Sequence, residues 1–411
     1  MGSYATLEPV NSAISPVSAR SRAAEIKGAI EEALARRFGR RFCCLTNRGT
    51  TALAAAFRAL DLPRGSPAVF PAAMCSIPVW AAPFSGLRPV FADVNLRDAN
   101  FDLESLEEAL AASPRPAVVV PVHMFGKPDD LVRLRELCGR NGAFLVEDCA
   151  LSMGARLGDR PAGGFGDLAC LSFVRKMVPL EMGGAVLTDD PLWDRRVREY
   201  ASGLPVRRVP EERIGEAMKA FHRATAQAAR QGWPPSDPLK APGESLRELL
   251  LVGTRLEDWE GSAILEELGR LDENLLSRRT RTEVYEDALR HPRIRPLERT
   301  GSSLFAYPIL LEGLDAEDFL AFTEARGRTF KRIAYPDIHR VFEAARPGEA
   351  FPMSERLERE LIGMPVAEDV PVSAYWDYAA DFVRMLEEYL DSPESRAPAE
   401  RPGRLALRMA S

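Results

Sequence analysis

Segments typical of β-strands and of α-helices alternate along the first half of the chain, and this alternation limits the possible folds more than any single motif. The predicted strands are 42–46, 68–70, 89–92, 117–122, 143–147, 169–173 and 185–188. The predicted helices between the earlier strands are 50–60, 77–84, 103–111 and 129–140. This pattern indicates an α/β fold with a mainly parallel, seven-stranded sheet between helices. The last two strands follow each other without a helix, so we expect an antiparallel strand there.

The chain has 411 residues, more than one hydrophobic core usually serves, so two domains are expected. We predict an N-terminal arm (1–17), a large domain (18–255), a smaller C-terminal α+β domain (256–391) and a disordered tail (392–411). Prolines interrupt the periodicity over 203–250, and we interpret this stretch as a variable loop region. A long helix is predicted over 256–289.

Composition narrows the range of partners and compartments. A net charge of −6 gives no electrostatic basis for binding nucleic acid or an anionic membrane surface. No apolar run approaches the roughly 18 residues of a membrane span, and no signal peptide is expected at the N-terminus. The six cysteines form no Cys-x-x-Cys pair, which is typical of reduced thiols in a cytoplasmic protein.

Lys176 is the most distinctive of only six lysines. It lies between two apolar segments, 168–173 and 183–188, where partial desolvation favours the neutral, nucleophilic amine. A predicted strand upstream ends at Asp148. Pyridoxal phosphate requires a lysine that forms a Schiff base and a carboxylate on its pyridinium nitrogen. The alternative is that Lys176 is a surface lysine whose apolar stem lies along the protein.

A turn that suits a phosphate group follows the first predicted strand. Gly49, Thr50 and Thr51 open the next helix, where free backbone N–H groups and hydroxyls are available to an anion. Ser172, four residues before Lys176, offers a further hydroxyl. The alternatives are a simple helix cap for the threonines and a structural serine at a strand end. The order of these features, rather than any one of them, indicates a cofactor site.

Two other polar residues follow predicted strands, and we expect both to be structural. Asp93 is followed by a turn-forming segment. His123 follows the strand at 117–122, and a buried histidine with hydrogen-bond partners is commoner there than a catalytic one. The four histidines show no ligand spacing for a metal.

The whole series of motifs resembles the DegT/StrS-type sugar aminotransferases, a family of pyridoxal phosphate enzymes of fold type I within the aspartate aminotransferase superfamily. The resemblance extends over about residues 15–390 and is carried by 47–53, 86–94, 122–130, 146–150, 166–173 and Lys176 with Gly183 and Gly184. It implies a Schiff base at Lys176, Asp148 on the ring nitrogen, and Gly49, Thr50 and Ser172 near the phosphate. It also implies a homodimer and transfer of an amino group from an amino acid to a keto-sugar, carried on a nucleotide.

The sequence departs from the family pattern at several site positions. Cys75 occupies the position where the family usually has an aromatic residue that stacks on the cofactor ring. Leu151 replaces the usual Gln or His three residues after the aspartate. The family's asparagine that reaches the phosphate of the partner subunit would fall near Gly253 or Thr254, and neither is asparagine. These changes leave two alternatives open, a pyridoxal phosphate lyase, dehydratase or non-sugar transaminase, and an inactive dimer.

Overall fold

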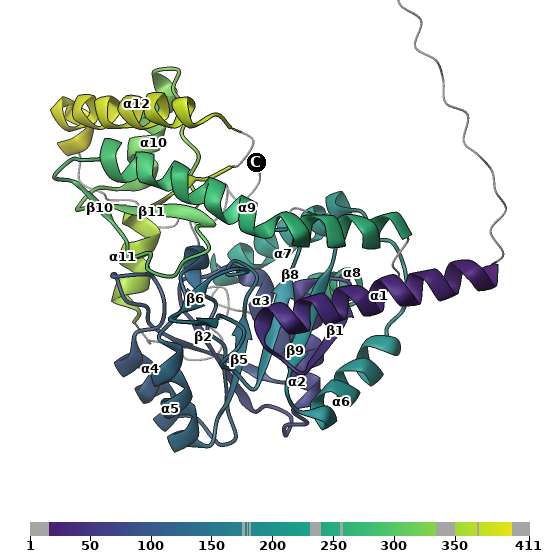
Figure 1. The fold of residues 1–411 in the computed structure, drawn as a ribbon. Helices are drawn as coiled ribbons and strands as arrows, with labels where there is room; N and C mark the ends of the chain where they lie inside the picture. The colour runs from purple at the N-terminus through teal and green to yellow at the C-terminus, as the bar shows by residue number, and fades with distance from the viewer. Residues whose placement is uncertain are drawn as a thin grey trace, which may run out of the picture.

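The computed structural model describes residues 16–174, 177–178, 180, 182–230, 240–254, 258–333, 350–367 and 370–396. A seven-stranded sheet lies at the centre of the larger part, in the order β1-β9-β8-β5-β4-β2-β3 (Figure 1). Its strands are β1 (Phe42–Thr46), β2 (Pro67–Pro71), β3 (Arg88–Ala92), β4 (Val118–Val119), β5 (Phe144–Asp148), β8 (Leu168–Ser172) and β9 (Gly184–Thr188).

Strand directions place most of the carboxyl ends at one edge of this sheet. Parallel pairing joins β3, β2, β4, β5 and β8 in turn, and β9 is antiparallel to both β8 and β1. The predicted seven-stranded, mainly parallel sheet with one antiparallel strand is therefore confirmed. Ligands of open α/β sheets bind beyond the carboxyl ends of the strands, so this edge is where a site is expected.

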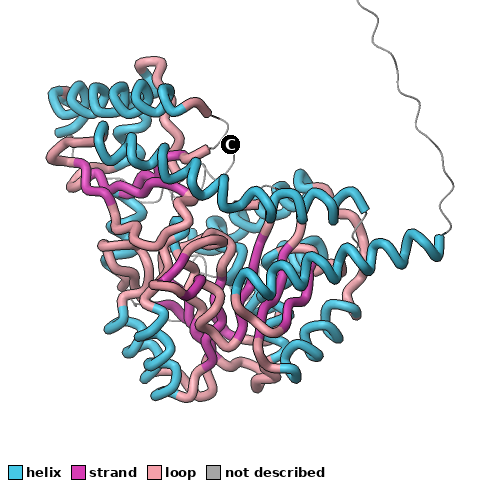
Figure 2. Tube along the Cα trace, in the orientation of Figure 1, coloured by secondary structure: helices cyan, strands magenta, loops and turns pink. Residues whose placement is uncertain are grey.

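Helices cover both faces of the sheet, which gives three layers (Figure 2). The helices of this part are α1 (Pro16–Phe38), α2 (Gly49–Ala59), α3 (Ser76–Phe84), α4 (Leu103–Ala111), α5 (Leu131–Asn141) and α6 (Pro191–Ser202). One face packs against α2 and α3, and its buried side chains include Cys44, Val146 and Cys170. The opposite face packs against α1 at one end and against α4 and α5 at the other.

Side-chain caps explain where several helices begin and end. Asp102 accepts a hydrogen bond from the Ser105 N–H at the start of α4, and Asp130 accepts one from the Arg133 N–H at the start of α5. Gly142 ends α5 with φ +59, a left-handed conformation that glycine adopts without steric cost. Asp93 caps α11 (Pro352–Glu360) through the backbone N–H groups of Met353 and Ser354, at 3.0 and 2.8 Å, which confirms the structural role predicted for it.

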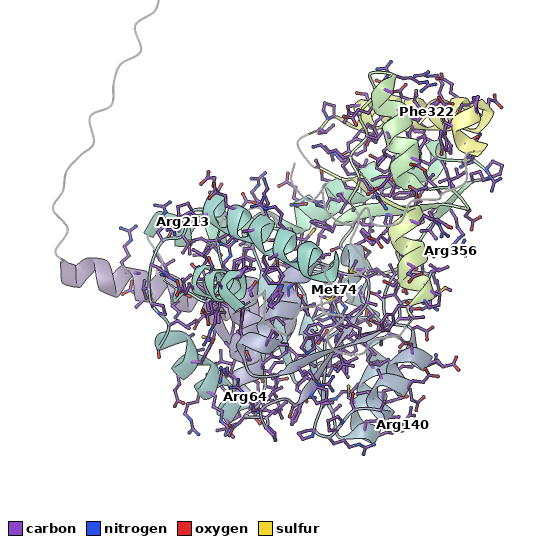
Figure 3. The ribbon with its side chains drawn as sticks, turned by 180° about the vertical axis from the view of Figure 1, so that it is seen from behind. Arg64, Met74, Arg140, Arg213, Phe322 and Arg356 are labelled. Carbon is purple, nitrogen blue, oxygen red and sulfur yellow. The ribbon has the colours of Figure 1, made fainter. Side chains whose placement is uncertain are left out.

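A second hydrophobic core lies in the C-terminal part of the chain. The strands β10 (Ile294–Pro296), β11 (Ala306–Leu311) and β12 (Leu361–Pro365) form an antiparallel sheet, packed with α10 (Ala316–Ala325) and α12 (Val372–Asp391). In the rear view, Phe322 lies in this part and Arg140 in the larger one, with Arg356 of α11 between them (Figure 3). The smaller C-terminal α+β domain and its boundaries stay a prediction.

The long helix α9 (Asp258–Ala288) belongs to both cores. Ile264, Leu268 and Leu271 in its first half pack with α1 and the large sheet, and Val284 and Tyr285 near its end pack in the C-terminal core. Figure 1 shows it running from one part of the molecule to the other. The change of core therefore occurs within this helix.

The interpretation of 203–250 as a loop region is wrong for most of its described residues. They form α7 (Glu211–Arg230) and α8 (Lys240–Leu250), which contact each other. Pro205 and Pro210 precede α7, and Pro242 lies in the first turn of α8, where proline is tolerated because the N–H groups there lack intrahelical acceptors. Phe221 of α7 is buried against Trp80 of α3, with 4.2 Å between ring centroids.

The tail begins with an ordered turn. Residues Pro393–Arg396 form a short 3-10 helix, so the predicted disorder is wrong for this turn, and the rest of the tail lies outside the described residues. All six cysteines are free thiols. Within the described residues, no helix combines the length and the apolar character that crossing a membrane requires.

Candidate active site

The candidate site lies at the sheet edge where β1 and β8 end and β9 begins. The pairing register sets Thr46 opposite Gly184 and Gly184 opposite Ser172, so the three residues stand side by side on adjacent strands. α2 begins three residues after Thr46, directly at this edge. The structure therefore brings together the turn and the serine that the sequence separates by more than a hundred residues.

Gly49 and Ser172 are in direct contact. A Cβ atom added to Gly49 would lie 2.7 Å from Ser172 Cβ, closer than real Cβ contacts allow, and 3.1 Å from Ser172 Oγ. The N-cap residue Arg48 is extended and makes no side-chain cap, and the first hydrogen bond of the helix runs from Ala52 N–H to Arg48 O. The backbone N–H groups at 49–51 therefore precede the helical hydrogen-bond series, in the position where helix N-termini bind anions.

The two neighbouring threonines differ in what their side chains do. Thr51 donates its hydroxyl hydrogen bond to Leu250 O at 2.9 Å, and this contact fastens the end of α8 to the start of α2. Its hydroxyl is thus used within the fold, although its backbone N–H remains at the helix start. Thr50 is buried at the same helix start. Gly49, Thr50, Thr51 and Ser172 remain predictions as cofactor-binding residues, and the structure places all four together.

Two glycines allow β9 to start beneath the first turn of α2. Gly183 has φ +107, which disfavours any other residue, and its N–H donates to Asn47 O at 2.6 Å. A Cβ on Gly184 would lie 2.6 Å from the carbonyl carbon of Arg48 and 2.7 Å from Leu171 O. The Gly-Gly pair noted in the sequence therefore has a packing reason at this site.

Asp148 ends β5 with its side chain on the face of the sheet that α2 covers. It pairs with Cys170, two residues before Ser172, and residues paired across neighbouring strands point to the same face. Only 2% of Asp148 is exposed, and its Oδ1 accepts a hydrogen bond from Ala150 N–H at 3.0 Å. A buried carboxylate thus lies on the same sheet face as Ser172, one strand away. Its predicted role on a pyridinium nitrogen stays a prediction.

Lys176 itself lies outside the described residues. Its neighbours Met177 and Val178 are buried in the core between the sheet and the helices α1 and α9. Cys75 is the N-cap residue of α3 and is half-buried, and Leu151 is buried. The role of Cys75 beside the cofactor ring stays a prediction.

His123 is structural, as predicted. It is fully buried at φ +52, its Nδ1 accepts a hydrogen bond from Asp129 N–H at 3.2 Å, and its Nε2 lies 3.3 Å from Glu147 Oε2. With Nδ1 as the acceptor, Nε2 carries the hydrogen that Glu147 accepts. Nothing in the sequence indicated the role of Glu147, the partner of His123. Its side chain points to the face of the sheet opposite to the one that Asp148 faces.

Glu147 is held by hydrogen bonds on both oxygens. Besides His123, the backbone N–H groups of Gly163, Phe165 and Gly166 donate to it at 2.7, 2.8 and 2.5 Å. Burial opposes ionisation, but the hydrogen bonds from His123 and the backbone outweigh it and lower the pKa of Glu147.

His123, Glu147 and Cys149 also have potential metal-ligand atoms within 4.8 Å of one another. The oxygens of Glu147 are already used by four donors. Burial raises the pKa of the Cys149 thiol, which disfavours the thiolate that a metal needs. His123 and Glu147 therefore form a structural hydrogen-bonded pair, and the buried thiol of Cys149 beside them is a poor metal ligand.

The donor set fits a phosphorylated, basic ring. A helix N-terminus with an adjacent hydroxyl complements a phosphate dianion. Because Gly49 has no side chain, the N-terminus of α2 can lie directly against Ser172. A buried carboxylate on the same sheet face complements a cationic ring nitrogen. The fold is α/β, and the groups at the carboxyl edge of its sheet are of the kind that suits a phosphorylated cofactor.

The chain belongs to the DegT/DnrJ/EryC1/StrS aminotransferase family, whose sequence model matches residues 21–373. The protein is therefore an enzyme of the amino-group-transferring class, and the predicted family and enzyme class are confirmed.

Individual proteins that are similar to this chain agree with its assignment to the aminotransferase family. A relative from Micromonospora megalomicea subsp. nigra, named dTDP-3-amino-3,4,6-trideoxy-alpha-D-glucose transaminase, is 28% identical over 83% of this chain and 84% of its own. The structure of Helicobacter pylori PseC, an aminotransferase of pseudoaminic acid biosynthesis, has a TM-score of 0.70 at 18% identity, covering 90% of this chain and 96% of the other. That of Escherichia coli GDP-4-keto-6-deoxy-D-mannose-3-dehydratase with bound hydrated PLP has a TM-score of 0.67 at 20% identity, covering 90% and 97%. Both structures confirm the predicted fold class for the large, mainly parallel sheet.

Proposed function

We propose that this protein transfers an amino group from an amino acid donor to a keto-sugar linked to a nucleotide, with pyridoxal phosphate as its cofactor. One observation carries the proposal: at one edge of the sheet the N-terminus of α2 lies against Ser172, and Asp148 lies on the same face of the sheet as Ser172. The chain that has this arrangement belongs to an aminotransferase family. When bound, pyridoxal phosphate supplies an electron sink for the carbanion formed from the amino donor.

Each proposed site residue has a separate task. The N–H groups at the start of α2 and the hydroxyl of Ser172 would hold the phosphate and so fix the position of the ring. Asp148 would hold a proton at the ring nitrogen, because a buried carboxylate beside that nitrogen favours its cationic form. Lys176 Nζ would carry the cofactor and then move the proton between the two carbon atoms that exchange it.

A sugar acceptor is supported by the relative named as a dTDP-sugar transaminase, which aligns over most of both chains. A dehydratase reaction is the second candidate, because dehydratases of GDP-4-keto-6-deoxy-D-mannose are also among the relatives, at 25% identity over 69% of this chain. Two substitutions leave this choice open: Leu151 in place of the usual Gln or His, and Cys75 in place of the usual aromatic residue.

We also propose a homodimer that works in the cytoplasm. Dimerisation follows from the family resemblance. The free state of all six cysteines is consistent with a reducing compartment.

Two half-reactions test the function. The purified holoenzyme is mixed with glutamate, glutamine and other amino acids, and loss of the visible cofactor band identifies the amino donor. The aminated enzyme is then given nucleotide-linked keto-sugars, and mass spectrometry of the product distinguishes gain of an amine from loss of water. A holoenzyme whose band responds to no amino acid would contradict the aminotransferase proposal, and a dehydrated product would support the second candidate.

A further inference from the structure

The loop between β8 and β9, which carries Lys176, is tied at its base by backbone hydrogen bonds. Phe173 N–H donates to Gly183 O at 3.0 Å, Leu180 N–H donates to Phe173 O at 3.1 Å, and Val174 forms a bridge with Leu180. These contacts join the two ends of the loop. The Leu180 N–H also donates to Val178 O at 2.9 Å, within the loop.

A residue of α9 also binds the loop, at Met177. The side-chain amide of Asn274 donates from Nδ2 to the backbone oxygen of Met177 at 3.3 Å. Asn274 is buried, and Met177 is 1% exposed. Met177 follows Lys176 directly, so the two Cα atoms are about 3.8 Å apart across one peptide bond. The contact therefore acts on the backbone next to the proposed cofactor lysine.

Arg278 fixes the orientation of the Asn274 amide. One turn further along α9, its Nε donates to Asn274 Oδ1 at 2.6 Å. Because the guanidinium can only donate, the amide oxygen must face it and the amide nitrogen must face Met177 O. The guanidinium also donates from Nη1 to Val366 O at 2.8 Å, just beyond β12. A continuous series of hydrogen bonds thus joins the C-terminal core to the residue after Lys176.

The identity of Asn274 is itself informative. Asparagine is a poor helix former, and a buried amide needs partners for both ends of its side chain. An apolar residue would suit the interior of α9 better if packing were the only requirement. A reacting amine must also be held within about 0.5 Å of its productive position, which requires a restrained backbone beneath it.

We propose that Asn274 and Arg278 are positioning residues for Lys176: they hold the backbone carbonyl of Met177, the next residue, and so restrict the backbone that carries the lysine. The inference rests on the proposed role of Lys176 as the cofactor-bearing lysine. It adds that the C-terminal core, through Val366 and Arg278, helps to set the geometry of the reacting amine.

The test compares Asn274→Asp and Asn274→Ala with Thr282→Val. Asn274→Asp keeps the volume and the acceptor for Arg278 but replaces the donor that faces Met177 O. Thr282 is the matched control, since it is buried on the same helix and its hydroxyl donates within that helix, to Arg279 O at 2.8 Å. Amide hydrogen exchange of the apo-protein, read on the peptide 173–183, measures the loop restraint. The pH midpoint of the visible cofactor band, followed in the holoenzyme, measures the position of the lysine amine.

Both Asn274 variants should exchange two- to tenfold faster over 173–183, the range that one buried hydrogen bond accounts for. They should also shift the pH midpoint of the cofactor band by about 0.3 to 1 pH unit, whereas Thr282→Val should change neither. Unchanged exchange and midpoint in both Asn274 variants, or equal changes in Thr282→Val, would overturn the inference. A wild-type protein in which borohydride traps no cofactor on Lys176 would overturn the proposed function instead, and the exchange result would still report the loop restraint.

Discussion

Replacing Gly49 with alanine is a direct test of the proposed cofactor site, because the structure shows which atoms the new methyl group would contact. Its Cβ would lie 2.7 Å from Ser172 Cβ and 3.5 Å from Leu171 O. Ser172 is the last residue of β8 and is fixed by its pairing with β9. Neither side can move without shifting a strand or the helix α2, so the methyl group must displace the helix start from the serine.

The magnitude follows from the cost of overpacking, which is about 1–3 kcal/mol for an added methylene in a packed region. If the displaced helix start is the phosphate site, the same free energy is lost from cofactor binding, which corresponds to about 5- to 150-fold in Kd. The assay is titration of the apo-enzyme with pyridoxal phosphate, followed through the visible band. Gly139→Ala in α5 is the control, because a Cβ there meets nothing within 4 Å.

A double variant separates the clash from the lost binding group. Ser172→Gly removes the Cβ that Gly49→Ala would meet, so the pair should recover most of the stability lost in Gly49→Ala, measured by thermal unfolding of the apo-protein. Cofactor affinity should not recover, since the hydroxyl is also gone. If Gly49→Ala binds pyridoxal phosphate as tightly as the wild type, the reasoning that places the phosphate between α2 and Ser172 is refuted.

Three further predictions concern single titratable or reactive groups. Lys176→Ala should abolish the cofactor adduct that borohydride traps, whereas Lys127→Ala should retain it, and an adduct found at Lys127 in the wild type would contradict the assignment. Asp148→Asn should leave the cofactor bound but slow the single-turnover reaction with an amino donor by several orders of magnitude, and near-normal turnover would show that Asp148 is structural. Burial and the nearby Asp98 carboxylate raise the pKa of Asp129 to about 7. Its folded pKa lies above the unfolded value of about 3.9, so the folded state binds the extra proton and stability should fall as pH rises from about 4 to 7. Asp129→Asn should reduce this fall, measured from urea midpoints at pH 5 and 8, and an unchanged pH dependence would contradict the raised pKa.

The large sheet could be predicted well because each strand is marked by residues that are neighbours in the sequence. Apolar runs such as 143–146, bounded by turn residues, mark buried strands independently of distant contacts. The prolines of 203–250 misled the prediction for the same reason. A proline within the first turn of a helix and one in a loop look alike in sequence, and only tertiary packing, such as that of Phe221 on Trp80, decides between them.

Residues whose partners are distant could not be found in this way. Asn274 and Met177 are 97 positions apart, and nothing near either of them in the sequence announces their hydrogen bond. The same holds for Asp93, which caps a helix that starts about 260 residues later. The order of Gly49, Asp148 and Ser172 indicated a site because each lies at or just beyond the carboxyl end of a strand. Parallel strands bring their carboxyl ends to one edge whatever their separation along the chain.

The adjacent acids Glu147 and Asp148 show why that edge matters for the chemistry. Side chains alternate along a strand, so two consecutive carboxylates must point to opposite faces of the sheet. Glu147 pairs with Ala169 and points toward the face of α1 and α5, where backbone N–H groups and His123 use both of its oxygens. Asp148 pairs with Cys170 and points toward the face of α2, where the proposed phosphate site lies. A shift of one residue in the register of β5 would exchange the two roles. The hydrogen bonds that hold Glu147 therefore also fix the register that directs Asp148 to the proposed cofactor site.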